Sequence, residues 1–170
     1  PLRVMHLTDH LPLRDVCDLI SADLVTKAIG QLNDALISWG ISKPRIAVAG
    51  LNPHASGKEE DEEIRPGVKA AQQLGINVEG PVPPDSVFRQ CIENKYDVVL
   101  AMFHDQGHIA IKTWGFSGNC ALIMGPPYLH MSVAHGTAYD LVGTGKADHT
   151  MMLEAIKLTG HLAAEKGFFK

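Results

Sequence analysis

The chain has 170 residues, of which 45% are hydrophobic and 20% are charged, and this length and composition suit one globular core. Its formal net charge of −4 argues against a nucleic-acid-binding protein, because such proteins usually carry a basic face. No apolar run approaches the roughly 20 residues that a membrane span needs, and nothing at the start is typical of a signal peptide. The three widely spaced cysteines are expected to be reduced, buried thiols of a cytoplasmic protein: Cys17, Cys91 and Cys120.

The first half of the chain is expected to alternate strands with helices. It begins without Met and enters a strand-like run at 2–7 almost at once, which predicts a segment of a larger protein. A helix is predicted over 22–39, with Ser21 as its N-cap and Gly40 just beyond its end. A second strand is expected over 45–51.

The acidic run at 58–63 is interpreted as the solvated first turn of a helix that reaches Leu74, because carboxylates there complement the helix dipole. It is therefore not interpreted as a metal cluster. The elements expected after it are an extended piece at 78–84, a helix capped by Asp85, an unbroken apolar strand at 98–103, a possible helix at 107–112, a strand at 120–124 and an amphipathic helix at 148–166. Apolar strands that alternate with helices predict an α/β fold with a mostly parallel sheet flanked by helices.

Three histidines follow the ends of predicted strands: His10, His54 and His104. Because the carboxyl ends of parallel strands meet at one edge of a sheet, all three are expected to project from that edge. Three imidazoles with an open position are typical of a site for zinc or a similar divalent ion. One such histidine alone is more often a hydrogen-bonded structural residue, so the metal hypothesis depends on the threefold pattern.

Other polar residues lie near these histidines in the sequence. Asp105 could orient an imidazole as a neighbouring carboxylate or simply cap the next turn. Lys112 could hold a substrate anion or relay a proton, or be an exposed helix lysine. The glycine-rich segment at 135–148 permits close backbone approach to a ligand, which by itself is a weak nucleotide signal.

Together these segments resemble the 4-hydroxythreonine-4-phosphate dehydrogenase family of pyridoxal phosphate biosynthesis. The matching pieces occur in the family's order and span nearly the whole chain: HLPLRDV at 10–16, GLNPHA at 50–55, Glu59-Glu60, 64–66, AMFHDQG at 101–107 with Lys112, and HGTAYDLVGTGKAD at 135–148. The last piece also resembles the adenosine-binding loop of the isocitrate and isopropylmalate dehydrogenases, whose fold the family shares.

The resemblance implies a homodimeric, divalent-metal-dependent NAD or NADP dehydrogenase that oxidises the secondary hydroxyl of a β-hydroxy acid, with possible decarboxylation. Zinc is the expected metal, with magnesium, manganese or cobalt as alternatives, and no nucleic-acid or membrane partner is implied. The chain would be the C-terminal half of a two-domain enzyme and would hold its metal and nucleotide sites. The implied roles are metal binding in a site shared across the dimer interface for His10, His54 and His104, substrate contact or catalysis for Lys112, and nucleotide binding for His135, Gly136, Thr137, Ala138 and Asp140.

The sequence departs from the family pattern around the substrate anion. Ala121 stands in place of an Asn, with Asn119 two places earlier, and His130 stands in place of an Arg. Ala134 replaces an Asp, and the loop after GLNPHA is shortened. Because arginine is hard to replace in a bidentate anion contact, these changes favour a different anionic group, with Asn119 and His130 as candidate substrate-binding residues. One alternative is therefore a related dehydrogenase for another sugar-acid phosphate or a cis-dihydrodiol carboxylate. Two further alternatives are independent of these changes: a metal-dependent hydrolase or lyase that uses the three histidines without nucleotide, and a non-catalytic metal-binding dimeric fragment.

Overall fold

The computed structural model of the protein describes residues 1–115 and 117–168. Its backbone divides into two compact units, Pro1–Thr113 and Trp114–Lys170. We describe each unit by itself.

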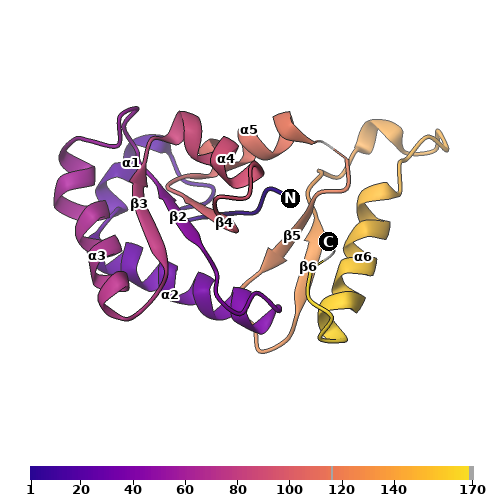
Figure 1. The fold of residues 1–170 in the computed structure, drawn as a ribbon. Coiled ribbons are helices and arrows are strands. Elements are labelled where there is room, and N and C mark those ends of the chain that lie inside the picture. The colour runs from indigo at the N-terminus through magenta and orange to yellow at the C-terminus, as the bar shows by residue number, and fades with distance from the viewer. Residues whose placement is uncertain (116, 169–170) are drawn as a thin grey trace. The chain divides into compact units, whose positions relative to one another are not determined.

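The first unit is built on a four-stranded sheet (Figure 1). Its strands are β1 (Val4–His6), β2 (Ile46–Ala49), β3 (Val78–Val82) and β4 (Val98–Ala101), and they lie in the order β1-β4-β2-β3. Every neighbouring pair runs parallel, which confirms the parallel sheet predicted for this part of the chain. The carboxyl ends of all four strands therefore meet at one edge.

Five helices accompany this sheet: α1 (Leu13–Leu19), α2 (Ala22–Ser38), α3 (Arg65–Gln73), α4 (Pro84–Ile92) and α5 (His104–Trp114). Helix α2 begins as predicted, because the Ser21 hydroxyl accepts a hydrogen bond from the Leu24 amide at 3.2 Å. It ends beside Gly40, whose φ of 96° lies in the left-handed region that glycine tolerates. Helix α5 begins earlier than the predicted 107–112, so His104 lies in its first turn.

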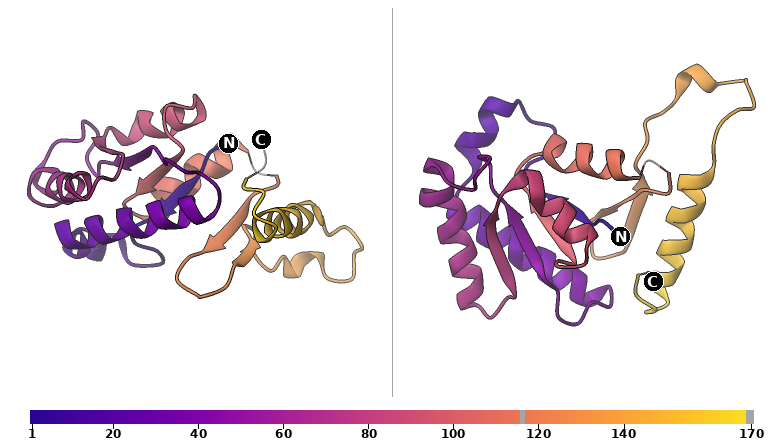
Figure 2. Two further views of the ribbon diagram at one scale, coloured as in Figure 1. Left: turned by 60° about the horizontal axis from the view of Figure 1, so that its bottom comes forward. Right: turned by 45° about the horizontal axis from the view of Figure 1, so that its top comes forward.

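The core of the first unit lies on both faces of the sheet. Strands β2 and β4 are buried at every position, as their unbroken apolar sequences require. Helices α2 and α4 lie on opposite sides of the sheet (Figures 1 and 2). Helix α2 buries Val25, Ala28, Ile29, Leu32 and Leu36, and α4 packs Val87 and Cys91 against Ala47, Ala49 and Val99. This packing fixes the strand ends that carry the candidate site.

The acidic run is helical, as predicted, but it is not fully solvated. Residues Glu60–Ile64 form a short π-helical segment that continues into α3; Asp61 and Glu62 are exposed, whereas the Glu60 side chain is 0% exposed. The Glu63 carboxylate accepts a hydrogen bond from the Ala22 amide at 2.8 Å and so caps α2. A backbone loop and a helix end attract these carboxylates because both present unpaired N–H groups. The capping role predicted for Asp85 is also wrong, since Pro83 is the N-cap of α4 and no side chain caps it.

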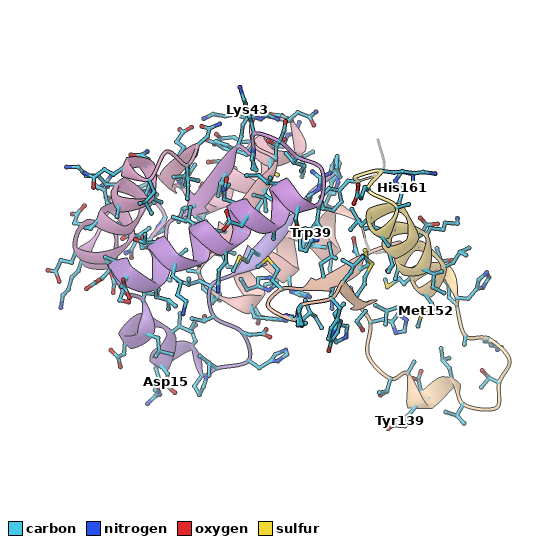
Figure 3. All side chains as sticks on the ribbon, turned by 90° about the horizontal axis from the view of Figure 1, so that it is seen from below. Asp15, Trp39, Lys43, Tyr139, Met152 and His161 are labelled. Atoms are coloured by element: carbon cyan, nitrogen blue, oxygen red, sulfur yellow. The ribbon has the colours of Figure 1, made fainter. Side chains whose placement is uncertain are left out.

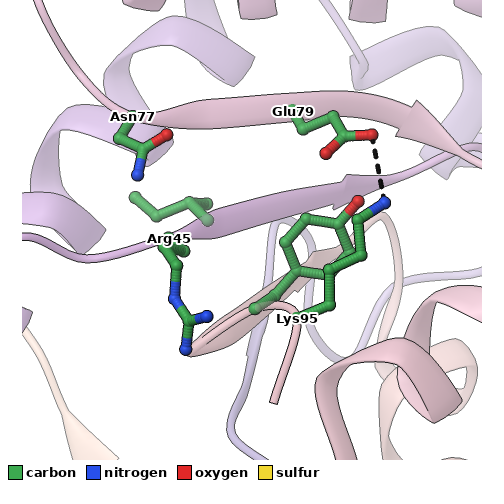
Figure 4. A pocket seen from close by; sticks show the side chains of 6 residues that line it. Arg45, Asn77, Glu79 and Lys95 are labelled. Atoms are coloured by element: carbon green, nitrogen blue, oxygen red, sulfur yellow. Dashed lines mark hydrogen bonds and ion pairs between the residues drawn. The ribbon is translucent and has the colours of Figure 1, made fainter. Parts of the chain in front are cut away.

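A shallow hollow lies at the amino ends of β2, β3 and β4 (Figure 4). Its charges are already paired: the Lys95 amine lies 3.4 Å from a Glu79 carboxylate oxygen, and Arg45 makes bonds of 2.8 and 3.0 Å to the two carboxylate oxygens of Asp97. The charged side chains of this hollow are therefore engaged in ion pairs.

The second unit contains a two-stranded antiparallel sheet of β5 (Cys120–Ile123) and β6 (His130–Val133). Strand β6 was not predicted, and it makes β5 part of an antiparallel pair, whereas the four strands of the first unit are parallel, consistent with the mostly parallel arrangement expected. The helix α6 (Thr150–Ala163) buries Met151, Ala155 and Leu162, and the Thr159 hydroxyl contacts the Met131 sulfur at 3.3 Å. A single 3₁₀ turn, Tyr139–Leu141, interrupts the segment between β6 and α6, and Tyr139 is 80% exposed (Figure 3).

All three cysteines are free, as predicted, but only Cys91 is buried, since Cys17 is exposed and Cys120 is partly exposed. Within residues 1–115 and 117–168, no helix combines the length and the apolar character needed to cross a bilayer.

Candidate metal centre

Two of the three predicted histidines come together at the carboxyl edge of the sheet. His10 follows the end of β1 by four residues, and His104 opens α5 three residues after β4. Because β1 and β4 are neighbours, their exits lie side by side. They border a hollow of about 250 Å³ lined by Asp9, His10, Leu11, Leu13, Val16, Phe103, His104 and Asp105.

The donor atoms in this hollow converge. One ligand atom each from Asp9, His10 and His104 lies within 4.8 Å of the other two, and the two imidazole centroids are 4.9 Å apart. Within the described part of the chain this is the single group of three such side chains. Imidazole nitrogens and a carboxylate oxygen at this spacing suit a zinc-like divalent ion. The His10 side chain is 82% exposed and the His104 side chain 28% exposed, so the site stays open to a substrate.

Asp105 holds the His104 ring. Its Oδ1 lies 2.7 Å from the His104 Nδ1, and this hydrogen bond keeps the pKa of the Asp105 carboxyl below its usual value. A carboxylate at Nδ1 favours the proton on that nitrogen and leaves Nε2 free as a ligand. Of the two roles considered for Asp105, this geometry supports the orienting one.

Two further histidines, His108 and His6, pack next to His104. The His108 ring stacks on His104 with centroids 4.1 Å apart, and its Nδ1 lies 3.2 Å from the His6 Nε2. Burial, together with the neighbouring His108 and His104, lowers the pKa of His6 to about 4. Burial also lowers the pKa of His108, with His104 and Lys112 contributing. The pair is therefore neutral near pH 7, so it adds no cationic charge to the metal-binding group.

His54 does not join this convergent group. It is exposed in the loop that follows β2, and the 4.8 Å group contains Asp9 in its place. The loop itself is firmly held, because Glu60 accepts hydrogen bonds from the Leu51 and Asn52 amides, each at 2.7 Å. Burial by itself would raise the pKa of Glu60, but these bonds outweigh it and lower the pKa.

Lys112 lies in the last turn of α5 and is exposed. It follows His104 and His108 at four-residue steps, so the three side chains lie along one side of the helix. Its amine can therefore reach toward a ligand above the histidines, or remain in solvent.

The remaining predicted residues lie in the second unit. His130 is exposed on β6, and the Asn119 side-chain amide donates a hydrogen bond to the Gly115 carbonyl. The predicted nucleotide-binding residues lie together on an exposed segment, in which Ala138 adopts a left-handed φ of 49°: His135, Gly136, Thr137, Ala138 and Asp140. The five residues therefore lie on one exposed stretch of the second unit.

Sequence reasoning missed Asp9, His6 and His108 as parts of the centre. Asp9 directly precedes His10, and His108 lies one helical turn after His104. Both could have been found from the sequence, His108 if the helix had been predicted to begin at residue 104. His6 lies in a strand between the apolar residues Met5 and Leu7 in the sequence, and no sequence pattern indicated a role for it.

Comparison with known protein families identifies one matching family model. The model described as "Pyridoxal phosphate biosynthetic protein PdxA" matches residues 1–159. A relative from Novosphingobium aromaticivorans, named "Putative 4-hydroxythreonine-4-phosphate dehydrogenase", is 71% identical over 99% of this chain. Another from Symbiobacterium thermophilum, named "Putative D-threonate 4-phosphate dehydrogenase", is 44% identical over 96% of it. The chain spans about half the length of these relatives, 51% and 50% respectively.

Solved structures show the same likeness. A 4-hydroxythreonine-4-phosphate dehydrogenase from Klebsiella pneumoniae is 44% identical, with a TM-score of 0.86 over 95% of this chain and 51% of its own. A terephthalate 1,2-cis-dihydrodiol dehydrogenase from Burkholderia xenovorans is 30% identical, with a TM-score of 0.75 over 99% of this chain and 54% of its own. Both similarities extend over both units.

Proposed function

Because the chain belongs to the PdxA family of pyridoxal phosphate biosynthetic proteins, we propose that the intact protein is a divalent-metal-dependent NAD(P) dehydrogenase. It oxidises the secondary hydroxyl of a β-hydroxy acid. The single observation that carries this proposal is the convergence of Asp9, His10 and His104 at the carboxyl edge of a parallel sheet.

The donor set fits a metal ion. His10 and His104 offer imidazole nitrogens, Asp105 orients one of the rings, and the hollow leaves room for substrate oxygens. A divalent ion held there supplies Lewis-acid chemistry that lowers the pKa of a bound hydroxyl. Zinc suits the imidazole-rich set, and cobalt or manganese would be accepted by the same ligands.

We place His54 in the same site on a second copy of the chain. Its exposed position outside the convergent group of its own copy leaves it available to another copy, and a homodimer with a shared site accounts for that position. Asp9 is then either a ligand in the isolated chain or a partner for His10, whose Nδ1 lies 3.7 Å from the Asp9 carboxylate.

The other predicted residues receive substrate and nucleotide roles. A nicotinamide cofactor supplies the hydride acceptor, and the exposed segment with His135, Gly136, Thr137, Ala138 and Asp140 is proposed to hold its adenosine part. Lys112 contacts the substrate and receives or relays the hydroxyl proton. Oxidation at the carbon β to a carboxylate gives a β-keto acid, which can then lose carbon dioxide.

The substrate is proposed to be a phosphorylated four-carbon hydroxy acid. Relatives that are 71% and 44% identical carry names of 4-hydroxythreonine and D-threonate phosphate dehydrogenases, whereas the dihydrodiol dehydrogenase is 30% identical. Asn119 and His130 are then the proposed contacts of the phosphate, in place of the family's asparagine and arginine. A cis-dihydrodiol carboxylate remains the second candidate because His130 replaces that arginine.

A substrate panel on the intact protein tests the proposal. We expect reduced nicotinamide to accumulate, by its absorbance, with 4-phosphohydroxythreonine or D-threonate 4-phosphate and added zinc, and expect a chelator to stop the reaction. Turnover of the dihydrodiol carboxylate alone would overturn the phosphorylated substrate. Metal binding without any oxidation across the panel would contradict the dehydrogenase assignment.

A further inference from the structure

We propose that Gln106 is a positioning residue that fixes the spacing between the strand exits that carry the histidines. Its proposed role involves no direct contact with metal or substrate. The inference rests on the proposed metal site, and it concerns residues to which neither the family likeness nor the sequence patterns assign a role.

The Gln106 amide group joins two strand exits. Its Oε1 accepts a hydrogen bond from the Met102 amide at 2.7 Å, and its Nε2 donates one to the Gly50 carbonyl at 2.9 Å. Met102 directly follows β4 and precedes His104 by two residues. Gly50 directly follows β2 and precedes His54 by four. One side chain therefore links the exit that bears His104 to the exit that bears His54.

Thr8 extends the link to the third exit. Its hydroxyl donates a hydrogen bond to the Met102 carbonyl at 2.9 Å, and Thr8 precedes His10 by two residues. Thr8 is 6% exposed and Met102 is 0% exposed, so water competes little for these groups. Both backbone polar groups of Met102 are thus held by side chains from outside β4.

The bonds of Gln106 and Thr8 connect the chain segments beyond the last paired residues of the sheet. The pairing of β2 with β4 ends at Val48 and Leu100, and that of β1 with β4 ends at His6 and Ala101, with one further bond from the Leu7 amide. Beyond those pairs, the bonds of Thr8 and Gln106 fix how far apart the three exits lie. The link crosses β1, β4 and β2 in their spatial order.

Metal affinity depends on such positioning, because ligands that must move or reorient on binding lower the affinity. The His104 exit serves the site of its own copy and the His54 exit serves the site of the second copy, so a shift of one exit against the other disturbs both sites. Loss of a hydrogen bond made directly to a metal ligand typically costs about 10–100-fold in affinity, and we expect the lower end for Gln106, which acts through the backbone of the strand exits. The structure therefore assigns Gln106 an effect on metal affinity, which is measured separately from its effect on the stability of the fold.

The test compares three variants of the intact protein. Gln106→Met keeps the side-chain length and loses both hydrogen bonds, whereas Gln106→Glu keeps the acceptor for Met102 and loses the donor to Gly50. Gln72→Met is the matched control, because the Gln72 Nε2 also donates to a backbone carbonyl, that of Val78, at 2.9 Å near the opposite edge of the sheet. The readouts are the cobalt dissociation constant, the cobalt absorption spectrum and the urea unfolding midpoint.

We expect both Gln106 variants to bind cobalt about 10-fold or more weakly with an altered spectrum, and Gln72→Met to bind like the wild type. If Gln106→Met unfolds, Gln106→Glu carries the test. Cobalt binding within twofold of wild type in the folded Gln106 variants would overturn the inference while leaving the proposed function intact. Absence of cobalt binding by the wild-type protein would instead overturn the proposed function, and this inference with it.

Discussion

Replacing His104 by alanine is expected to weaken divalent-metal binding to the intact protein by more than about 100-fold and to abolish metal-dependent turnover. His104 is central to the site, because it lies among His10, His108 and His6 and is oriented by Asp105. The His104 side chain is partly exposed, so its removal should leave the fold intact. Isothermal titration with zinc, together with a chemical unfolding curve, measures both effects.

The matched control for this variant is His161→Ala. The His161 Nδ1 is bonded to the Gly167 carbonyl at 2.9 Å on α6, so the control also removes a histidine ring that makes a polar contact. It should bind zinc like the wild type. Full metal-dependent activity in His104→Ala would remove the metal hypothesis.

The second large effect is expected at Glu60, where replacement by alanine should lower the free energy of unfolding by about 3–5 kcal/mol. The Glu60 side chain is 0% exposed, and its two oxygens accept bonds from the Leu51 and Asn52 amides and from the Asn52 side chain at 2.6–2.7 Å. Alanine leaves these donors without the acceptor and opens a cavity. Urea denaturation, with hydrogen exchange at the Leu51 and Asn52 amides, measures the loss of stability and of loop protection.

This effect should depend on pH. Because the pKa of Glu60 is lower in the folded protein than its unfolded value of about 4.3, its contribution is fully present above that value. The contribution of Glu60 is lost as the pH falls through its folded-state pKa. A Glu60→Gln variant, which cannot ionise, should therefore differ less from the wild type in free energy of unfolding at that low pH than at neutral pH. The exposed Glu62→Ala in the same segment is the control, with an expected change within about 0.5 kcal/mol. Equal stability of the Glu60→Ala and Glu62→Ala variants would refute the role of Glu60.

The sequence predicted most of the first unit because its local signals agree with its packing. The apolar runs that become β2 and β4, the Ser21 cap and the Gly40 stop each indicated the element that forms. The antiparallel strand β6 (His130–Val133) was not predicted, because its residues alternate between exposed and half-buried positions and form no strong apolar run. Its partner β5 was predicted, and pairing across a turn was not visible in the sequence.

The candidate site was predicted in its residues and less well in its geometry. His10 and His104 come together because their strands are neighbours, which the rule about parallel strand ends anticipates. The role of Glu60 could not be foreseen, because it depends on a loop folding back over a carboxylate that is eight residues from Asn52. Gln106 likewise bonds to Gly50, 56 residues away, and no local pattern encodes such a contact.

The most direct test of the central claim is anomalous X-ray diffraction from crystals of the intact protein grown with zinc or cobalt. We expect one strong anomalous peak about 2.0–2.1 Å from imidazole nitrogens of His10 and His104 of one copy and His54 of a second. A peak bound by His10 and His104 without His54 would contradict the shared site and leave Asp9 as a ligand. An anomalous map with no peak at His104, in crystals that contain the metal, would contradict the metal centre itself.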